Sequence, residues 1–158
     1  MTKEDQLQKV GSDIRRIALE WEGKLSGLQE EQITQRLNRQ GRNIKQLVGH
    51  MIDLASNNHQ WMVRLQYINN LQLPDFRHHS DLWISIQQYQ QEDWKEMLEL
   101  WKSYNFHIAH LIKYVDPSCL NNCWTDGEKE PLRLLDLIYD YLAHLRYSIN
   151  EINLLLKA

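Results

Sequence analysis

The chain is poor in the residues that interrupt helices. Only six of its 158 residues are glycine and three are proline, while leucine, glutamine and glutamate are plentiful, a balance that favours helix over sheet. Long apolar runs are also missing, and no stretch approaches the ~20 residues that a membrane-spanning helix needs. The first residues, Met-Thr-Lys-Glu-Asp, lack the apolar core of a signal peptide. We therefore expect a cytoplasmic protein with no membrane partner.

Positive charge and cysteine are scarce as well. The net charge is -3 and no basic stripe with interleaved aromatic residues occurs, which argues against a nucleic-acid partner. Cys119 and Cys123 form a single C-x-x-x-C pair, which could hold a metal or form a disulfide. Without a second pair, and in a cytoplasmic protein, two reduced structural thiols are the favoured interpretation. There is no glycine-rich phosphate loop, no Gly-x-Ser-x-Gly elbow and no His-Glu-x-x-His helix.

Apolar residues recur at spacings of three and four along four long segments, a pattern typical of amphipathic helices. Asn43 is the expected N-cap of the second helix, and Pro131 is expected in the first turn of the last one. No segment has the pattern of a strand. The sequence therefore predicts one all-α domain, residues 1–158, folded as a four-helix bundle. The first three expected helices span 3–24, 43–69 and 92–115.

Two histidines on two of these helices could share a divalent ion across the bundle core. His50 and His144 each flank an apolar stripe, so both should point toward the bundle interior rather than to bulk water. A carboxylate lies one turn from each, Asp53 beside His50 and Asp140 beside His144. Metal-bound imidazoles commonly donate their second N–H to such a group. The alternative for each is a core histidine whose hydrogen bonds are satisfied by a neighbour.

The other five histidines are weaker candidates. His59 lies nine positions after the first candidate, on the opposite face of the helix at ~100° per residue. His107 and His110 are i,i+3 neighbours that could chelate an ion, although two polar side chains on the flanks of a helix are the favoured interpretation. The pair His78-His79 falls in a connection and should be exposed to solvent.

Four stretches of the chain carry a distinctive pattern. They are Ile44-Lys45-Gln46-Leu47-Val48-Gly49-His50-Met51-Ile52-Asp53, Asp81-x-Trp83 followed by Gln87-x-Tyr89, Leu100-Trp101-x-x-Tyr104-Asn105-x-His107-x-x-His110 and Asp140-Tyr141-x-x-His144-Leu145. Together they resemble the DinB-like (YfiT-like) family. The likeness extends from about residue 28 to the C-terminus, and it implies an up-down-down-up four-helix bundle that is often a homodimer.

The resemblance also implies a divalent metal, commonly nickel or zinc, held by three histidines. One comes from the second helix and two come from an H-x-x-x-H pair in the last. His50 matches the first ligand and His144 the second, but the third falls on Ser148. A serine hydroxyl is a poor ligand for such ions, and sites of this kind need three protein ligands, so metal binding should be weak or absent. Asp53 or Asp140 could orient the histidines or replace the missing ligand.

Two more positions depart from the family pattern. Arg42 stands where many members have a tryptophan, and Tyr147 stands where many have another histidine.

Three functions stay open, and the residues do not decide whether the protein is an enzyme or which residues would be catalytic. The first is a metal-dependent transferase or hydrolase, in which a metal-bound water or thiolate attacks a small electrophile. The second is a metal-free relative whose pocket binds a small molecule or only packs. The third is an interaction module that forms a homodimer or docks another chain. The family likeness favours the first, and Ser148 favours the other two.

Overall fold

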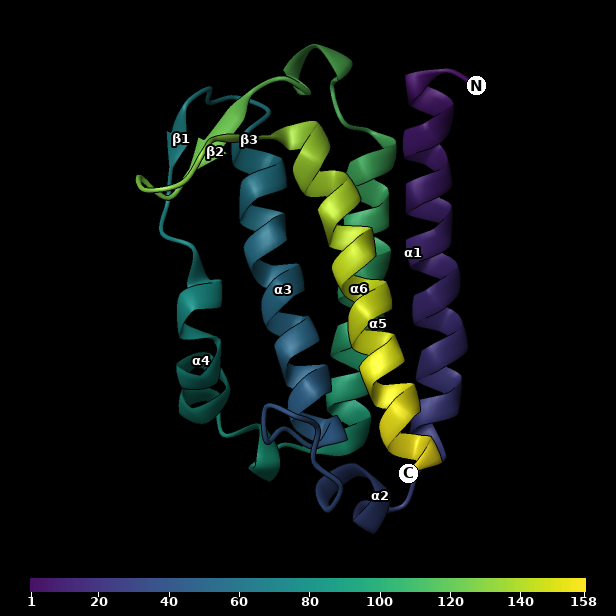
Figure 1. Cartoon of the computed structure of the whole chain (residues 1–158). Helices are drawn as coiled ribbons and strands as arrows, with labels where there is room; N and C mark the ends of the chain where they lie inside the picture. The colour runs from purple at the N-terminus through teal and green to yellow at the C-terminus, as the bar shows by residue number, and fades with distance from the viewer.

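Four long helices form a bundle in the computed structural model, which describes residues 1–158 (Figure 1). Helix α1 packs against α5 and α6, and α3 packs against the same two helices. In Figure 1, α1 and α6 run downward while α3 and α5 run upward, so the predicted up-down-down-up arrangement is confirmed. The four helices are α1 (Lys3–Ser26), α3 (Ile44–Arg64), α5 (Trp94–Lys113) and α6 (Leu134–Lys157).

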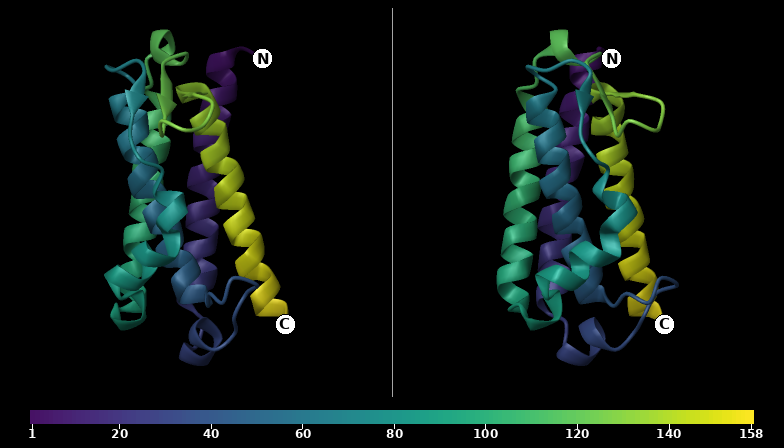
Figure 2. Two further views of the ribbon diagram at one scale, coloured as in Figure 1. Left: turned by 60° about the vertical axis from the view of Figure 1, so that its left-hand side comes forward. Right: turned by 90° about the vertical axis from the view of Figure 1, so that its left-hand side faces the viewer.

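A long crossover joins α3 to α5, because these two consecutive long helices run in the same direction. The chain must return along the whole bundle between them, and Figure 2 shows α4 lying beside α3 on this return path. A shorter connection with helix α2 (Glu30–Thr34) joins α1 to α3. The crossover contains the 3₁₀ turn η1 (Phe76–His79), helix α4 (Ser80–Gln87) and the 3₁₀ turn η2 (Tyr89–Gln91).

Side-chain caps fix where the long helices begin. At the start of α3, Asn43 Oδ1 accepts from the backbone N–H of Gln46 at 2.8 Å, and Gln46 Oε1 accepts from the backbone N–H of Asn43 at 3.0 Å. This reciprocal capping box satisfies two amide groups that have no partner within the helix, and it confirms Asn43 as the N-cap. Asp93 caps α5 in a similar way, with its side chain accepting from the backbone N–H of Glu96.

A small three-stranded sheet covers one end of the bundle and corrects two predictions. Strand β1 (Leu71–Gln72) pairs in parallel with β2 (Cys123–Thr125), which pairs in antiparallel fashion with β3 (Leu132–Arg133). The sequence predicted no strand, because segments of two or three residues are too short to show alternation. Pro131 therefore precedes β3 and is not in the first turn of α6, which begins at Leu134. Residue Gly127, with φ +96°, lies in the turn between β2 and β3.

The core between the helices is apolar with a few buried polar groups. Tyr141 of α6 donates its hydroxyl to Asn105 of α5, whose amide donates to the backbone oxygen of Trp101 at 2.8 Å. Trp101 is fully buried, and its Nε1 has no hydrogen-bond partner. Both cysteines are free thiols, as expected. None of the helices combines the length and apolarity needed to cross a membrane.

Candidate functional site

A pocket of about 200 Å³ lies between α3, α6 and the crossover. It brings together the three positions that match the metal ligands of the DinB-like family. His50 comes from the middle of α3, and His144 and Ser148 come from successive turns of α6. Arg42 lines the pocket from the segment before α3, and Arg77 lines it from η1. The remaining wall includes Asn38, Gln40, Ser80, Tyr147 and Glu151.

His50 is half-buried and its imidazole is neutral at pH 7. Burial, with the positive charge of Arg42 nearby, lowers its pKa to about 4. Its Nδ1 is buried and has no hydrogen-bond partner. Asp53, expected to orient this ring, instead accepts hydrogen bonds from Tyr89 Oη at 2.7 Å and Gln87 Nε2 at 2.8 Å. The Asp53 carboxylate therefore holds the crossover against α3 and does not orient the ring of His50.

His144 is exposed rather than directed into the bundle interior, which corrects the prediction. It lies on the flank of the apolar stripe of α6, and α4 packs against α3 instead of covering this position. Partial burial of the ring, followed by the charge of Arg77, lowers the pKa of His144, while Asp140 acts in the opposite direction. Arg77 Nη1 lies 3.5 Å from His144 Nε2. Asp140 forms no hydrogen bond with the ring.

Two arginines form the positively charged part of the pocket wall, and the sequence did not single them out as site residues. Arg42 is only 6% exposed, and its Nη2 donates to Ser80 Oγ at 3.0 Å and Asp81 Oδ1 at 2.8 Å. Arg77 donates through Nε and Nη2 to the buried carboxylate of Asp75, at 2.9 and 2.8 Å. Arg42 drew notice only as a departure from the family pattern. Arg77 could not be recognised as a pocket residue from the sequence, because it reaches the pocket only when the crossover folds against α3 and α6.

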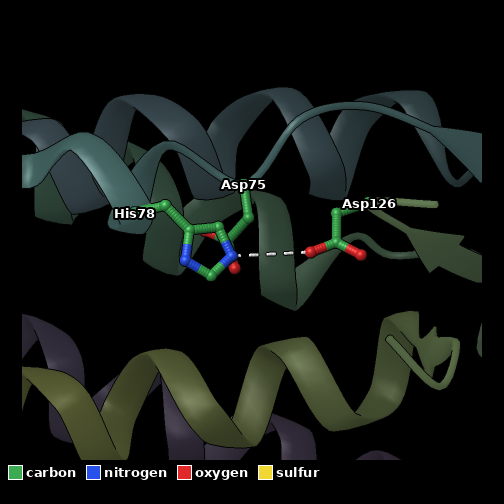
Figure 3. A group of neighbouring side chains, drawn as sticks. All are labelled: Asp75, His78 and Asp126. Carbon is green, nitrogen blue, oxygen red and sulfur yellow. Dashed lines mark ion pairs between the residues drawn. The ribbon is translucent and has the colours of Figure 1, made fainter. Parts of the chain in front are cut away.

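A second group of potential ligands lies outside the pocket, where β2 ends and η1 begins. Asp75, His78 and Asp126 each offer a ligand atom, and these atoms lie within 4.8 Å of one another. Figure 3 shows the ring of His78 facing the carboxylate of Asp126, with Asp75 behind the ring. His78 Nε2 is 3.6 Å from Asp126 Oδ2, and the His78 side chain is about half exposed. The three residue types could hold a metal ion.

The carboxylates of this group already have partners within the protein. Asp75 also accepts from the backbone N–H of Arg77 at 3.0 Å and lies 3.8 Å from Lys129 Nζ. Although burial acts to raise it, the pKa of Asp75 is lowered by the hydrogen bonds from Arg77. Asp126 accepts from the backbone N–H groups of Glu128 and Lys129, both at 2.9 Å. These contacts connect the turn between β2 and β3 to the crossover.

The other histidines of the long helices, His59, His107 and His110, lie outside the pocket. His59 is on α3, where its Nδ1 lies 2.8 Å from Tyr104 Oη of α5. Its ring contacts that of His107 edge to face, with centroids 5.1 Å apart. His107 and His110 are both exposed on α5, as expected of polar residues on the flank of a helix. None of these three rings lines the pocket.

The architecture has a known counterpart. The chain has the fold of YfiT from Bacillus subtilis. The two structures superpose with a TM-score of 0.86 over 98% of this chain and 87% of that chain, at 15% sequence identity. YfiT is described as a probable metal-dependent hydrolase with an unusual four-helix bundle topology. Comparisons of the sequence with protein-family models and with curated proteins gave no match. The likeness to YfiT confirms the predicted YfiT-like bundle.

Proposed function

We propose that this chain is a DinB-like protein whose pocket binds a small molecule without a tightly bound metal ion. The observation that carries the proposal is the composition of the pocket wall. Two guanidinium groups, those of Arg42 and Arg77, line the same pocket as the two imidazoles. The residues at the family's ligand positions therefore do not fit a tightly held divalent ion, for two separate reasons.

The first reason is the number of ligands. His50 and His144 supply two neutral nitrogens, and the third position carries Ser148, whose side chain is buried and makes no hydrogen bond within the protein. Zinc and similar ions need three protein ligands in an open site, and a neutral hydroxyl is a poor substitute for an imidazole. Asp53 does not line the pocket, and its Oδ1 is held by Tyr89 and Gln87 of the crossover.

The second reason is charge. Arg77 Nη1 lies 3.5 Å from Nε2 of His144, so an ion bound to that nitrogen would approach a fixed positive charge. At a separation of ~4 Å and an effective dielectric constant of ~20, a doubly charged ion and a guanidinium repel each other by about 8 kcal/mol. Asp75 offsets part of this repulsion because it pairs with Arg77. The remainder still opposes a cation at this position.

Elemental analysis tests the metal half of the proposal. Protein purified without a histidine tag should contain well under one equivalent of transition metal, both before and after dialysis against nickel, zinc or manganese. Thermal unfolding with a panel of small molecules tests the other half. At least one compound should raise the melting temperature by the same amount with and without EDTA, because a ligand that binds only the folded state stabilises it. Stoichiometric zinc or nickel that survives dialysis would contradict the proposal.

A second candidate function is a metal-dependent transferase or hydrolase acting on a small thiol or electrophile. The fold shared with YfiT, described as a probable metal-dependent hydrolase, favours it. Here His50 and His144 would hold nickel or zinc, with Asp140 or Ser148 completing the ligand set. Turnover of a thiol or ester substrate that is abolished by EDTA and restored by one equivalent of metal would move this candidate ahead.

A further inference from the structure

We propose that the pocket between α3, α6 and the crossover is a site for a small oxyanion, such as the phosphate or carboxylate group of a metabolite. The proposal rests on the proposed function, since it names the class of molecule that the metal-independent pocket would take. The two arginines of the wall, and the scarcity of acceptors around them, carry it.

Arg42 is held through Nη2 alone, which is fixed by Ser80 and Asp81. Neither Nε nor Nη1 makes a hydrogen bond within the protein, and the residue is only 6% exposed, so most of its hydration has been removed on folding. A buried polar group without a partner is costly, and in native proteins such a group often has a functional reason. Nε is closed to solvent, whereas Nη1 keeps some access, so Nη1 is the nitrogen that an acceptor oxygen of a ligand would meet.

Arg77 is arranged in the same way from the opposite wall. Nε and Nη2 are occupied by Asp75, which does not line the pocket. The remaining nitrogen, Nη1, has one neighbour, His144 Nε2, at 3.5 Å, which is longer than an ordinary hydrogen bond. Both guanidiniums are therefore positioned by a carboxylate outside the pocket, and each keeps its Nη1 without a firm partner in the protein. A guanidinium N–H of this kind can donate a charge-assisted hydrogen bond to a phosphate or carboxylate oxygen.

The rest of the wall adds donors and only one acid. Ser148 is buried without a hydrogen bond, and the hydroxyl of Tyr147 and the amide of Gln40 are also within the lining. Glu151 is the one carboxylate that lines the pocket, and it lies 3.5 Å from Asn38 Nδ2. The ionised groups of the wall are thus two arginines and one glutamate. A volume of about 200 Å³ restricts the ligand to a small molecule.

Other charged groups lie around the pocket and reduce its positive potential. Asp75 and Asp81 each pair with one of the two arginines, and Asp140 lies near both Arg77 and His144. None of the three lines the pocket. Their charges limit the affinity for an anion. The oxygens of Asp75 and Asp81 are hydrogen-bonded to the arginines, so these two acids hold the guanidiniums in place without lining the pocket.

The test is calorimetric titration of the whole chain with inorganic phosphate and, separately, with acetate, at constant ionic strength and with EDTA present. We expect phosphate, acetate or both to bind once per chain, and the stronger of the two identifies the group that the pocket prefers. Glu151→Gln should tighten binding by about two- to fivefold, because it removes the single negative charge of the wall. The control is Arg15→Gln, an exposed arginine on α1 far from the pocket, which should leave binding unchanged.

A second variant is designed to weaken anion binding by removing Arg77. Asp75 is replaced at the same time, so that no buried charge is left without its partner. Asp75→Asn combined with Arg77→Gln should weaken binding by about 10- to 100-fold, as expected for loss of charged hydrogen bonds. Circular dichroism checks that this variant folds; if it does not, Glu151→Gln still decides. Absence of any phosphate or acetate binding would overturn the inference, as would Glu151→Gln with unchanged or weaker binding, or a loss in the Arg15→Gln control.

The same experiments distinguish failure of the oxyanion inference from failure of the proposed metal-independent function. If neither anion binds but an uncharged compound stabilises the chain in EDTA, the oxyanion inference fails and the metal-independent pocket stands. If phosphate binds only after zinc is added, the metal-independent function fails.

Discussion

The replacement of Gly49 by alanine should destabilise the fold, although the same change in an open helix position is stabilising. Gly49 lies in α3 one residue before His50, and a Cβ at this position would come within 2.6 Å of Cγ and Cε2 of Tyr89. Real Cβ atoms do not approach other carbons so closely. The ring of Tyr89 is 3% exposed and its hydroxyl bonds to Asp53 at 2.7 Å, so it has no free space to move into.

The size of the effect follows from three contributions. Overpacking a core costs about 1–3 kcal/mol. Displacing the ring of Tyr89 also breaks its hydrogen bond to the Asp53 carboxylate, which costs about 1.5–3 kcal/mol. Alanine is better than glycine within a helix by about 1 kcal/mol. The free energy of unfolding should therefore fall by about 1.5–5 kcal/mol, a decrease in melting temperature of roughly 6–12 °C for a mid-range change of ~3 kcal/mol.

The assay is urea and thermal unfolding followed by circular dichroism, with Gly23→Ala as the matched control. Gly23 is an exposed position of α1, and a Cβ there would meet nothing within 4 Å. This variant should gain up to about 1 kcal/mol from helix propensity alone. Parent-like or higher stability for Gly49→Ala, with the control behaving as expected, would refute the close packing of the crossover on α3.

A double-mutant cycle locates the cause. Tyr89→Ala removes the ring and should destabilise the chain by itself through the cavity it leaves. In that background, Gly49→Ala should no longer destabilise, because the clash has been removed, and should recover the helix propensity of alanine. Additive losses in the double variant would show that the damage at Gly49 does not act through Tyr89.

The remaining predictions concern the pocket, a buried acid and assembly. Ser148→His should give His144 an i,i+4 histidine partner opposite His50 and raise the affinity for nickel or zinc by orders of magnitude in equilibrium dialysis. The gain should be lost with His50→Ala, and no gain would contradict the inferred pocket geometry. Burial raises the pKa of Asp53 despite the hydrogen bonds from Tyr89 and Gln87. The ionised carboxylate therefore destabilises the fold at pH values above the folded-state pKa. This cost is relieved as the pH falls through the folded-state pKa and the group takes up a proton. Asp53→Asn should therefore raise the melting temperature at pH 7, with a difference from the parent that shrinks in acid and that would contradict the burial argument if it grew. By the family resemblance the chain should form a homodimer, and light scattering after size exclusion would show a monomer if this is wrong.

The four long helices and their arrangement could be predicted because each carries a continuous apolar stripe. The helix cap at Asn43 could also be predicted from the sequence. Asn43 and Gln46 form a local motif whose hydrogen bonds lie within four adjacent residues. The sheet could not be predicted, since its strands are two or three residues long and β1 pairs with a strand about fifty residues further along the chain. Pro131 fitted a helix start equally well, but β3 occupies the two positions after it.

The candidate site was predictable only where it lies on long helices. His50, His144 and Ser148 could be placed near one another from helical register and the family resemblance, and they line one pocket. The exposure of His144 depends on where α4 packs, which its own helix does not encode. Arg77 comes from a short turn with no periodic pattern, so neither its position nor its pairing with Asp75 could be inferred before the crossover was folded.

The parallel orientation of α3 and α5 has a consequence for the order in which the pocket can form. Its wall combines a loop before α3, a turn in the crossover and two turns of α6, so Arg42 and His144 meet across a chain separation of about a hundred residues. Contacts between such distant segments form slowly, because loop closure must precede any gain from the contact. Helical turns can form while the chain is still emerging from the ribosome, where synthesis proceeds at about 5–20 residues per second. The pocket cannot form until α6 has been synthesised, because α6 supplies the wall that comes latest in the chain. Ligand binding would therefore show that all three walls have come together.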